Sequence, residues 1–235
     1  MTFTESIYKS ASAIKSADAL LIGASNGLSI AEGYHIFATN DMFQRQFEDF
    51  KLKYGIRNVI EGCFFNYPDK KSKQDFLQRL ILHWVENYRP TQVMKDLRSI
   101  VGNKDYFILT SNADTHLELS GFLPEKVFEI EGTFQDMLTR RIPEDKSKTL
   151  NDFLCRYHGK RLVILELGIG RHNRLIKHPL MQLAAHEPQA TYITLNLSDE
   201  LYIPAEIAHK SIGLAGDISM TLDALTSVCN DIEEK

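Results

Sequence analysis

The chain has 235 residues, of which 43% are hydrophobic and 25% are charged, and its net charge is −4. It contains neither a basic block nor an apolar run that could span a bilayer, so neither a nucleic-acid nor a membrane partner is expected. The three cysteines lie far apart without a Cys-x-x-Cys pair, which argues against a disulfide framework and a cysteine-rich zinc site. The first 17 residues lack the layout of a secretory signal, so we expect a cytoplasmic protein.

The first predicted unit is a strand that runs directly into a glycine-rich turn. Thr2 opens a capping-box pattern, and helical spacing continues to Ala17. Ala19–Ile22 is a short buried strand, followed by the turn Gly23–Ser29 and by Gly33. A strand, a glycine-rich turn and a helix in this order let backbone N–H groups approach a phosphate. Such turns also simply connect elements, so this signal is weak by itself.

Residues 34–102 have the pattern of a helical insertion. Asp41–Tyr54 and Thr91–Val101 are predicted helices, and Ser72 is predicted to cap a long helix that stops before Pro90. Residues 58–68 are aromatic and are predicted to be irregular. The aromatic side chains of this lobe either line an acceptor groove or form the lobe core, and a core is favoured; they include Phe64, Phe65, Tyr67 and Trp84.

The segment Tyr106–Asp114 is the most informative part of the sequence. It begins as an apolar, strand-sized run and ends in small and polar residues, with Asn112 and Asp114 two positions apart. In an open parallel sheet, such a break falls at the carboxyl end of a strand, where ligands bind. A structural turn is the alternative, because both residue types suit turns. His116 follows, and a solvated or capping role is expected for it.

The remaining segments alternate between helices and strands. A short helix is predicted at Thr115–Gly121 and a surface loop at Arg140–Lys148. Strands are predicted at Val127–Glu131, Arg161–Leu167, Thr191–Leu195 and Ser211–Leu214, and helices at Leu150–Tyr157, at Leu175–His186 and from Ile218 onward. The pattern predicts an α/β fold with a doubly wound, Rossmann-like parallel sheet of about six strands. Residues 1–33 and 103–235 form this domain, and residues 34–102 form a smaller inserted helical lobe.

In chain order, these loops resemble those of the sirtuins. The recurring features are the Gly-Ala-x turn at Gly23, the Thr-x-Asn-x-Asp run ending at Asp114, the Gly-x-Gly loop at Gly168, Asn196 after the next strand, and the final Gly-Asp at Asp217. The first turn has the longer form Gly-Ala-x-x-Gly-Leu-Ser-x-x-x-Gly. That form is similar to the class M, macrodomain-linked sirtuins of bacteria.

Several positions depart from the sirtuin pattern. Glu131 stands where deacylating sirtuins place a histidine, and Ser111 replaces a glutamine. Tyr34–Ala38 lacks the Asp-Phe-Arg run. Gly132–Lys160 has one cysteine where most members carry four zinc ligands, so we expect no zinc module and no metal.

The resemblance implies that NAD is bound and opened between its nicotinamide and ribose. It implies catalytic roles for Asn112, Asp114 and Glu131, with Asn112 against the ribose and Asp114 against the nicotinamide amide. Gly23, Ala24 and Ser25 would face the phosphates. The full set implied for binding NAD is Gly23, Ala24, Ser25, Gly27, Ser111, Gly168, Gly170, Asn196, Asp217 and Ile218.

Glu131 directs the functional expectation away from deacylation. A carboxylate can accept a proton and can also stabilise a positively charged ribose directly. We therefore expect ADP-ribosyl transfer to a protein acceptor, and the class M resemblance implies a lipoylated carrier protein as acceptor and a macrodomain protein as partner. A residual NAD-dependent deacylase and a non-catalytic module that binds NAD or ADP-ribose stay open as alternatives.

Overall fold

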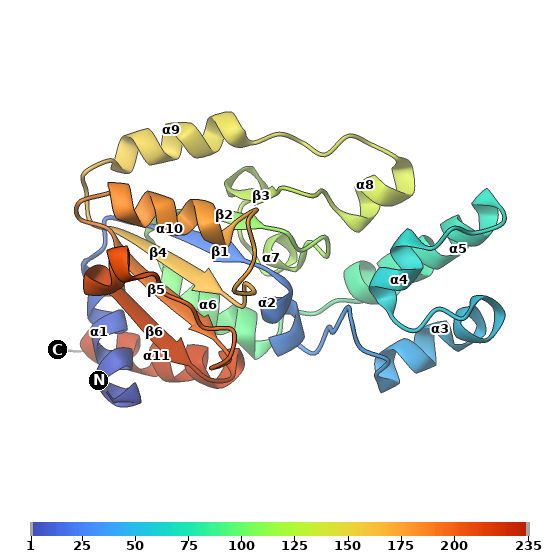
Figure 1. Ribbon diagram of the computed structural model, residues 1–235, viewed down its shortest axis with the longest axis horizontal. Coiled ribbons are helices and arrows are strands. Elements are labelled where there is room, and N and C mark those ends of the chain that lie inside the picture. Colours follow the sequence, from blue (N-terminus) through green and yellow to red (C-terminus); the bar gives the residue numbers. More distant parts are fainter. Residues whose placement is uncertain (1, 234–235) are drawn as a thin grey trace.

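The computed structural model describes residues 2–233, so the outermost positions of the predicted domain ranges, 1, 234 and 235, lie outside it. A parallel sheet forms the centre of the molecule (Figure 1). Its strands are β1 (Ala19–Ala24), β2 (Asp105–Thr110), β3 (Val127–Glu129), β4 (Leu162–Leu167), β5 (Thr191–Asn196) and β6 (Ser211–Ala215), in the order β3-β2-β1-β4-β5-β6. The predicted doubly wound, Rossmann-like sheet of about six strands is confirmed.

The register of the central strands brings three loops out of the sheet together. Ala24 pairs with Thr110 of β2 on one side and with Leu167 of β4 on the other. The loops that begin at Ser25, Ser111 and Gly168 therefore leave the sheet side by side. The winding direction reverses between β1 and β4, and open α/β sheets bind ligands at such a switch point.

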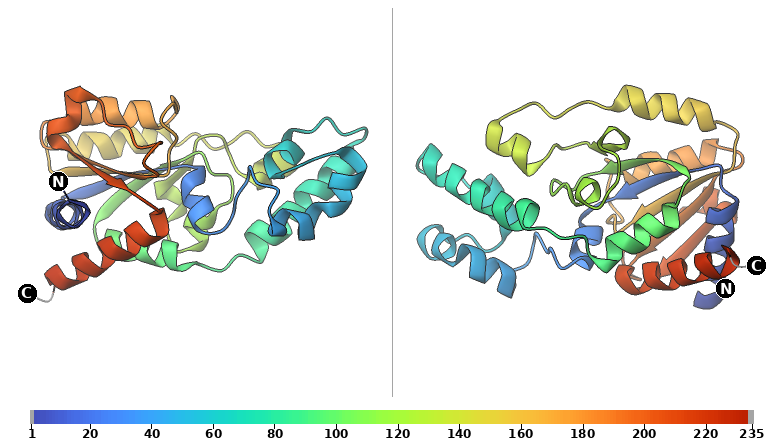
Figure 2. Two further views of the ribbon diagram at one scale, coloured as in Figure 1. Left: turned by 60° about the horizontal axis from the view of Figure 1, so that its bottom comes forward. Right: turned by 180° about the vertical axis from the view of Figure 1, so that it is seen from behind.

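Helices cover both faces of the sheet (Figures 1 and 2). One face packs against α1 (Phe3–Ser16), α2 (Asn26–Ala31), α6 (Gln92–Val101), α7 (His116–Leu119) and α11 (Ile218–Glu233). The other face packs against α9 (Ser147–Tyr157), α10 (Lys177–His186) and the 3₁₀ helix η3 (Ala205–Lys210). A second 3₁₀ turn, η2 (Pro124–Lys126), precedes β3. Both faces of the strands are therefore buried, which explains why β1 and β4 are almost entirely apolar in sequence.

The lobe projects beyond the carboxyl ends of the strands (Figure 1). It consists of α3 (Asp41–Tyr54), α4 (Val59–Phe64), α5 (Lys70–Ile81) and the π-helical turn η1 (Leu82–Glu86). Its core is aromatic and includes Phe47, Phe76 and Trp84. Phe134 of α8 (Phe134–Thr139) joins this core, whereas α6 packs on the sheet. The division at residues 33 and 103 stays a prediction.

Local details differ from the sequence predictions where short elements are concerned. Asp69, not Ser72, caps α5, and its carboxylate accepts from the Ser72 N–H at 2.7 Å. Residues 59–64, predicted to be irregular, form α4. Pro179 is the third residue of α10, in the first turn of the helix, where a missing N–H breaks no helical bond. It therefore does not kink the helix.

The end of the long lobe helix widens into a π turn. In η1 the Asn87 N–H donates to the Leu82 carbonyl at 3.0 Å, and the Tyr88 N–H donates to Val85 at 3.2 Å. Such turns insert an extra residue and release a carbonyl from the regular helical pattern. Separately, none of the helices among residues 2–233 is long and apolar enough to cross a membrane.

Candidate active site

Two pockets open at the carboxyl ends of the strands, and Asn26 lines both. The first, which we call the lobe pocket, has a volume of about 140 Å³ and lies between the sheet and the lobe; it is lined by Asn26, Ser29, Ile36, Ile60, Cys63, Phe64, Trp84, Ser111, Asn112, Ala113, Asp114, Glu131, Gly132, Phe134 and Met137. The second, the switch-point pocket, has a volume of about 570 Å³; its lining includes Ser25, Asn26, Gly27, Phe37, Gly168, Gly170, Asn173, Asn196, Glu200, Gly216, Asp217 and Ile218. The larger one has the size of typical small-molecule sites, which span about 300–1,000 Å³.

Asn112 lies at the floor of the lobe pocket with one polar atom unused. Its side chain is buried, and its Nδ2 donates to the Ser25 carbonyl at 3.2 Å. Its backbone N–H donates to Thr110 Oγ1 at 3.0 Å, which fixes the turn after β2. Asn112 Oδ1 is buried with no hydrogen-bond partner among the described residues. Buried polar atoms in native proteins are rarely left unpaired, so this oxygen is available to a ligand.

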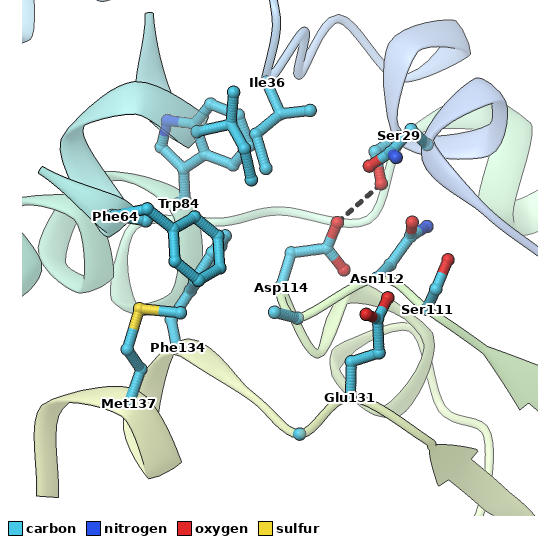
Figure 3. Close-up of a pocket in the computed structure, with 15 residues that line it drawn as sticks. Ser29, Ile36, Phe64, Trp84, Ser111, Asn112, Asp114, Glu131, Phe134 and Met137 are labelled. Carbon is cyan, nitrogen blue, oxygen red and sulfur yellow. Dashed lines mark hydrogen bonds between the residues drawn. The ribbon is translucent and has the colours of Figure 1, made fainter. Parts of the chain in front are cut away.

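Asp114 is buried beside Asn112 and is held by two donors. Ser29 Oγ donates to its Oδ2 at 2.5 Å (Figure 3), and the His116 N–H donates to its Oδ1 at 3.1 Å. Between them, Thr115 has φ 56° and ψ 19°, in the left-handed region. A β-branched residue is strained there, and strain of this kind is found at functional sites. The left-handed conformation of Thr115 thus places the His116 N–H against the Asp114 carboxylate.

Glu131 joins these two residues from the turn that follows β3. The strand ends at Glu129, two residues earlier than predicted, and Glu131 lies just before Gly132, whose φ is 77°. Its side chain is exposed and points toward Asn112 and Asp114 (Figure 3). None of the described residues that line this pocket is a histidine. The lobe pocket therefore presents two carboxylates and an amide.

Apolar side chains of the lobe form the opposite wall of the lobe pocket. Trp84 is buried and lines the pocket, while Phe64 is 70% exposed at its mouth. Phe65 and Tyr67 instead pack in the lobe core. The four aromatic residues thus divide between a pocket wall and a core. Burial raises the pKa of the Cys63 thiol in the pocket lining to about 12, which disfavours the reactive thiolate.

The glycines of the switch-point pocket are needed because two loops touch there. A Cβ on Gly27 would lie 2.5 Å from the Cα of Gly168, whose φ is 61°. The Gly27 N–H donates to the Gly168 carbonyl at 3.1 Å, and the Ser25 N–H donates to Leu167 at 3.3 Å. These N–H groups therefore join the two loops to each other. The sequence suggested that they would be available to a phosphate.

The other predicted residues of this pocket also hold loops in place. Asn196 Nδ2 donates to the Ile169 carbonyl at 2.8 Å and its Oδ1 accepts from the Leu197 N–H at 3.0 Å. Asp217 Oδ1 accepts from the Met220 N–H at 3.0 Å at the start of α11. Ser111 Oγ lies 2.9 Å from Ser25 Oγ at the junction of the pockets.

Two residues predicted to face the phosphates of NAD lie inside the sheet and not at a pocket wall. Gly23 and Ala24 are inside β1, and neither lines either pocket. A Cβ on Gly23 would lie 2.3 Å from Leu180 Cδ1, so this glycine makes room for α10. The other predicted residues of the NAD set, with Ile218 and Gly170, are brought together at the pocket walls.

Sequence reasoning missed a buried charged cluster behind Asp114. His116 has no exposed side-chain surface, contrary to the expected solvated role. Its Nδ1 lies 3.0 Å from Glu32 Oε2, and its Nε2 lies 2.7 Å from the Trp84 carbonyl. Burial alone would lower the pKa of His116, but the Asp114 and Glu32 carboxylates outweigh it and raise the pKa. The partners come from α2 and the lobe, so no local pattern pointed to this cluster.

The described residues contain no group of three or more His, Cys, Asp or Glu side chains that could hold a metal ion. The polar groups of both pockets are instead amides, hydroxyls and carboxylates. Such groups suit a polar organic ligand with ribose hydroxyls and amides.

Comparison with known proteins gives a fold and two named relatives. A solved structure of a Sir2 enzyme superposes with a TM-score of 0.59, covering 98% of this chain and 99% of that one at 12% identity. The chain has the Sir2 fold. A protein ADP-ribosyltransferase of Staphylococcus aureus is 25% identical over 93% of this chain and 86% of its own length. No protein-family model matches.

A second relative matches part of the Sir2-fold chain. It is a probable bifunctional ADP-ribose hydrolase/ADP-ribosyltransferase of Fusarium oxysporum f. sp. cubense. The identity is 32% over 126 residues, which cover 52% of this chain and 20% of that protein.

Proposed function

We propose that this chain is an NAD-dependent ADP-ribosyltransferase that opens the nicotinamide–ribose bond of NAD and transfers ADP-ribose to a protein. The observation that carries the proposal is the convergence of an unpaired Asn112 oxygen and the carboxylates of Asp114 and Glu131 on one pocket. The Sir2 fold and the names of the two relatives support it.

The two pockets fit the two ends of NAD. The switch-point pocket is large enough for the adenosine half, and the lobe pocket joins it at Asn26. When bound, NAD supplies a bond whose opening leaves positive charge on the ribose. Asn112 Oδ1 and the two carboxylates would stabilise that charge, and hydrogen bonds already fix Asn112 and Asp114 in place before reaction. Glu131, which is exposed, would also accept the proton of the incoming acceptor group.

We further propose that the chain belongs to the macrodomain-linked branch of the sirtuins. The long Gly23–Gly33 turn supports this branch, and so does a relative whose name combines an ADP-ribose hydrolase with a transferase. The acceptor would then be a lipoylated carrier protein, and a macrodomain protein would remove the modification. The apolar wall of the lobe pocket is compatible with an acceptor arm that is itself largely apolar.

The decisive experiment incubates the purified protein with labelled NAD and a cell lysate or a lipoylated carrier protein. We expect free nicotinamide and label on protein. A parallel reaction with an acylated peptide tests deacylation, and O-acyl-ADP-ribose formed there at a rate matching nicotinamide release would reject our proposal in favour of a deacylase. Binding of NAD without any nicotinamide release would instead indicate a non-catalytic module.

The variant Glu131→Gln tests the role of that carboxylate. Gln has nearly the same shape but cannot accept a proton, so we expect the transfer rate to fall by roughly 10²–10⁴-fold. A rate equal to that of the wild-type protein would show that Glu131 is only an exposed residue of the turn.

A further inference from the structure

The hydrogen bonds and the two carboxylates around His116, behind Asp114, favour a charged histidine. The Trp84 carbonyl can only accept, so His116 Nε2 must carry a proton. Glu32 Oε1 already accepts from the Tyr88 hydroxyl at 2.6 Å and from Thr91 Oγ1 at 2.7 Å. The Asp114 and Glu32 carboxylates raise the pKa of His116, which favours a proton on Nδ1 as well, donated to Glu32 Oε2 at 3.0 Å. With both ring nitrogens protonated, His116 is an imidazolium.

Aromatic rings enclose this imidazolium on the lobe side. The Tyr88 ring stacks on the imidazole with centroids 3.9 Å apart and an interplanar angle of 15°. The Tyr34 ring meets it edge-on at 4.5 Å. Contact with the face of the Tyr88 ring favours the cation, and the side chains of Glu32 and His116 have no exposed surface. The ionisable groups that face His116 are thus Glu32, Asp114, Tyr34 and Tyr88.

Glu32 balances the charge of His116, so Asp114 leaves the lobe pocket negative. His116 Nδ1 lies 3.0 Å from Glu32 Oε2 and 3.8 Å from Asp114 Oδ2. One positive charge therefore lies between two carboxylates. Glu32 compensates the cation, so Asp114 keeps its own negative charge for the lobe pocket. Without Glu32, the imidazolium would neutralise the carboxylate that faces the ligand.

The cluster also joins three of the segments around the lobe pocket. Glu32 follows α2, which carries Ser29, the donor to Asp114. His116 begins α7, and Trp84 belongs to η1. Replacing His116 or Glu32 would therefore change the orientation of Asp114 and the position of Trp84 together.

We propose that His116 and Glu32 are positioning residues that aim Asp114 into the lobe pocket and leave its negative charge uncompensated there. The proposal rests on the proposed function, because Asp114 is there assigned to the opening of NAD. Neither residue lines the pocket, so both act through Asp114.

The test compares the variants Glu32→Gln, His116→Gln and the double variant in the full chain. The His116 N–H and Ser29 still bind Asp114 in every variant, so any loss reports the charged pair. A misplacement of about 1 Å can cost about 10²-fold in rate, and we expect a fall of that size in kcat for nicotinamide release. KM for NAD should change by less than about threefold, because the switch-point pocket is intact.

The double variant distinguishes positioning from a purely structural role. Each single variant removes one partner of the buried His116–Glu32 pair and is expected to unfold more easily, whereas the double variant removes both charges and keeps the net charge of the cluster unchanged. We expect the double variant to regain the thermal stability of the wild-type protein and to stay slow. A double variant that regains both stability and kcat would overturn the proposal.

A second His–Glu pair in the chain gives a matched control. His158 Nδ1 lies 2.8 Å from Glu187 Oε1 at the opposite end of the sheet, where α9 and α10 end. The His158→Gln and Glu187→Gln double variant should keep kcat within about twofold of the wild-type protein. An equal loss of kcat in this control would show that the effect is not specific to Asp114.

Nuclear magnetic resonance of ¹⁵N-histidine-labelled protein tests the charge without any turnover. Both ring nitrogens of His116, assigned with the His116→Gln variant, should be protonated at a pH one unit above the ordinary imidazole pKa of about 6.5. A neutral ring there would overturn the proposal. If the wild-type protein releases no nicotinamide, the proposed function fails, and this measurement still reports on the charged pair.

Discussion

The two pockets at the carboxyl end of the sheet use their polar groups in opposite ways. In the switch-point pocket, Asn196 and Asp217 bind backbone groups of neighbouring loops, and the Gly27 N–H binds Gly168. In the lobe pocket, Asn112 Oδ1 is unpaired and Glu131 is exposed. The polar groups of the first pocket therefore fix its shape. The second pocket keeps polar atoms free to contact a ligand, so substitutions in the two pockets should change different kinetic constants.

Two asparagines at the carboxyl ends of strands, one in each pocket, provide the largest contrast. Asn112→Ala should lower kcat for nicotinamide release by about 10²–10³-fold, or about 3 kcal/mol, because a fixed group aimed at the developing charge is lost. Asn196→Ala should instead raise KM and lower the free energy of unfolding by about 1–3 kcal/mol, because it leaves backbone groups unpaired. Steady-state kinetics and urea unfolding measure both. If the two variants had the same kinetic profile, the division of roles between the pockets would be wrong.

A methyl group at the contact between the loops should have the next largest effect. In Gly27→Ala the new Cβ would lie 2.5 Å from the Gly168 backbone, and backbone cannot move aside as a side chain can. We expect a loss of about 3 kcal/mol in the free energy of unfolding. Gly170→Ala is the control, because its Cβ would meet only Glu200 Oε2 at 3.6 Å, and its unfolding should change by less than about 1 kcal/mol.

Protonation of a carboxyl pair near the lobe pocket should make stability depend on pH. Burial, with a hydrogen bond and charge from Glu129, raises the pKa of Glu118 to about 8. A raised folded-state pKa means that the stabilisation is present below the ordinary value of about 4.3 and is lost as pH rises toward 8. Glu118→Gln replaces the carboxyl O–H donor with an amide N–H that does not titrate, so it should raise the free energy of unfolding at pH 8 by on the order of 1–2 kcal/mol.

The matching measurement at low pH is the control for that prediction. At pH 5 the wild-type Glu118 already carries its proton, so wild-type and variant unfolding should nearly coincide. A gain of equal size at both pH values would indicate a packing effect and contradict the titration of Glu118 as its cause.

The smallest expected effect concerns the strained turn beneath the lobe pocket. Thr115→Gly removes the left-handed strain and should raise the free energy of unfolding by on the order of 1 kcal/mol. The freer backbone should lower kcat severalfold, because Asp114 is less fixed. Arg140→Gly is the control: Arg140 has φ 55° at the end of α8, lines neither pocket, and should gain stability with unchanged kcat.

The sheet was predictable because its signals are local. Each buried strand, such as Leu162–Leu167, is an apolar run with a turn after it, and the order of loops indicated the fold. The short helices α4 and α8 were not predicted because six residues carry too little helical periodicity. Ser72 and Asp69 are both good capping residues, and the sequence alone does not decide between them.

The sequence predicted which residues lie at the site better than it predicted which groups they contact. Asn112, Asp114 and Glu131 were found from strand ends and motif order, and they do face one pocket. The use of the Ser25 and Gly27 N–H groups depends on the register between β1 and β4, which the sequence does not encode locally. The burial of His116 depends on Trp84 and Tyr88, which lie about thirty residues earlier on the lobe.

The π turn of η1 (Leu82–Glu86) fixes the number of residues in this segment. Its extra residue removes the Tyr88 N–H from the Trp84 carbonyl, and that carbonyl accepts from His116 instead. Deleting one residue between Leu82 and Glu86 would rewind the turn and rotate Trp84 by about 100°. The carbonyl would return to the helix, and the imidazolium would lose its acceptor. We therefore expect insertions and deletions to be tolerated in the exposed loop 140–145 and to be excluded from these five residues.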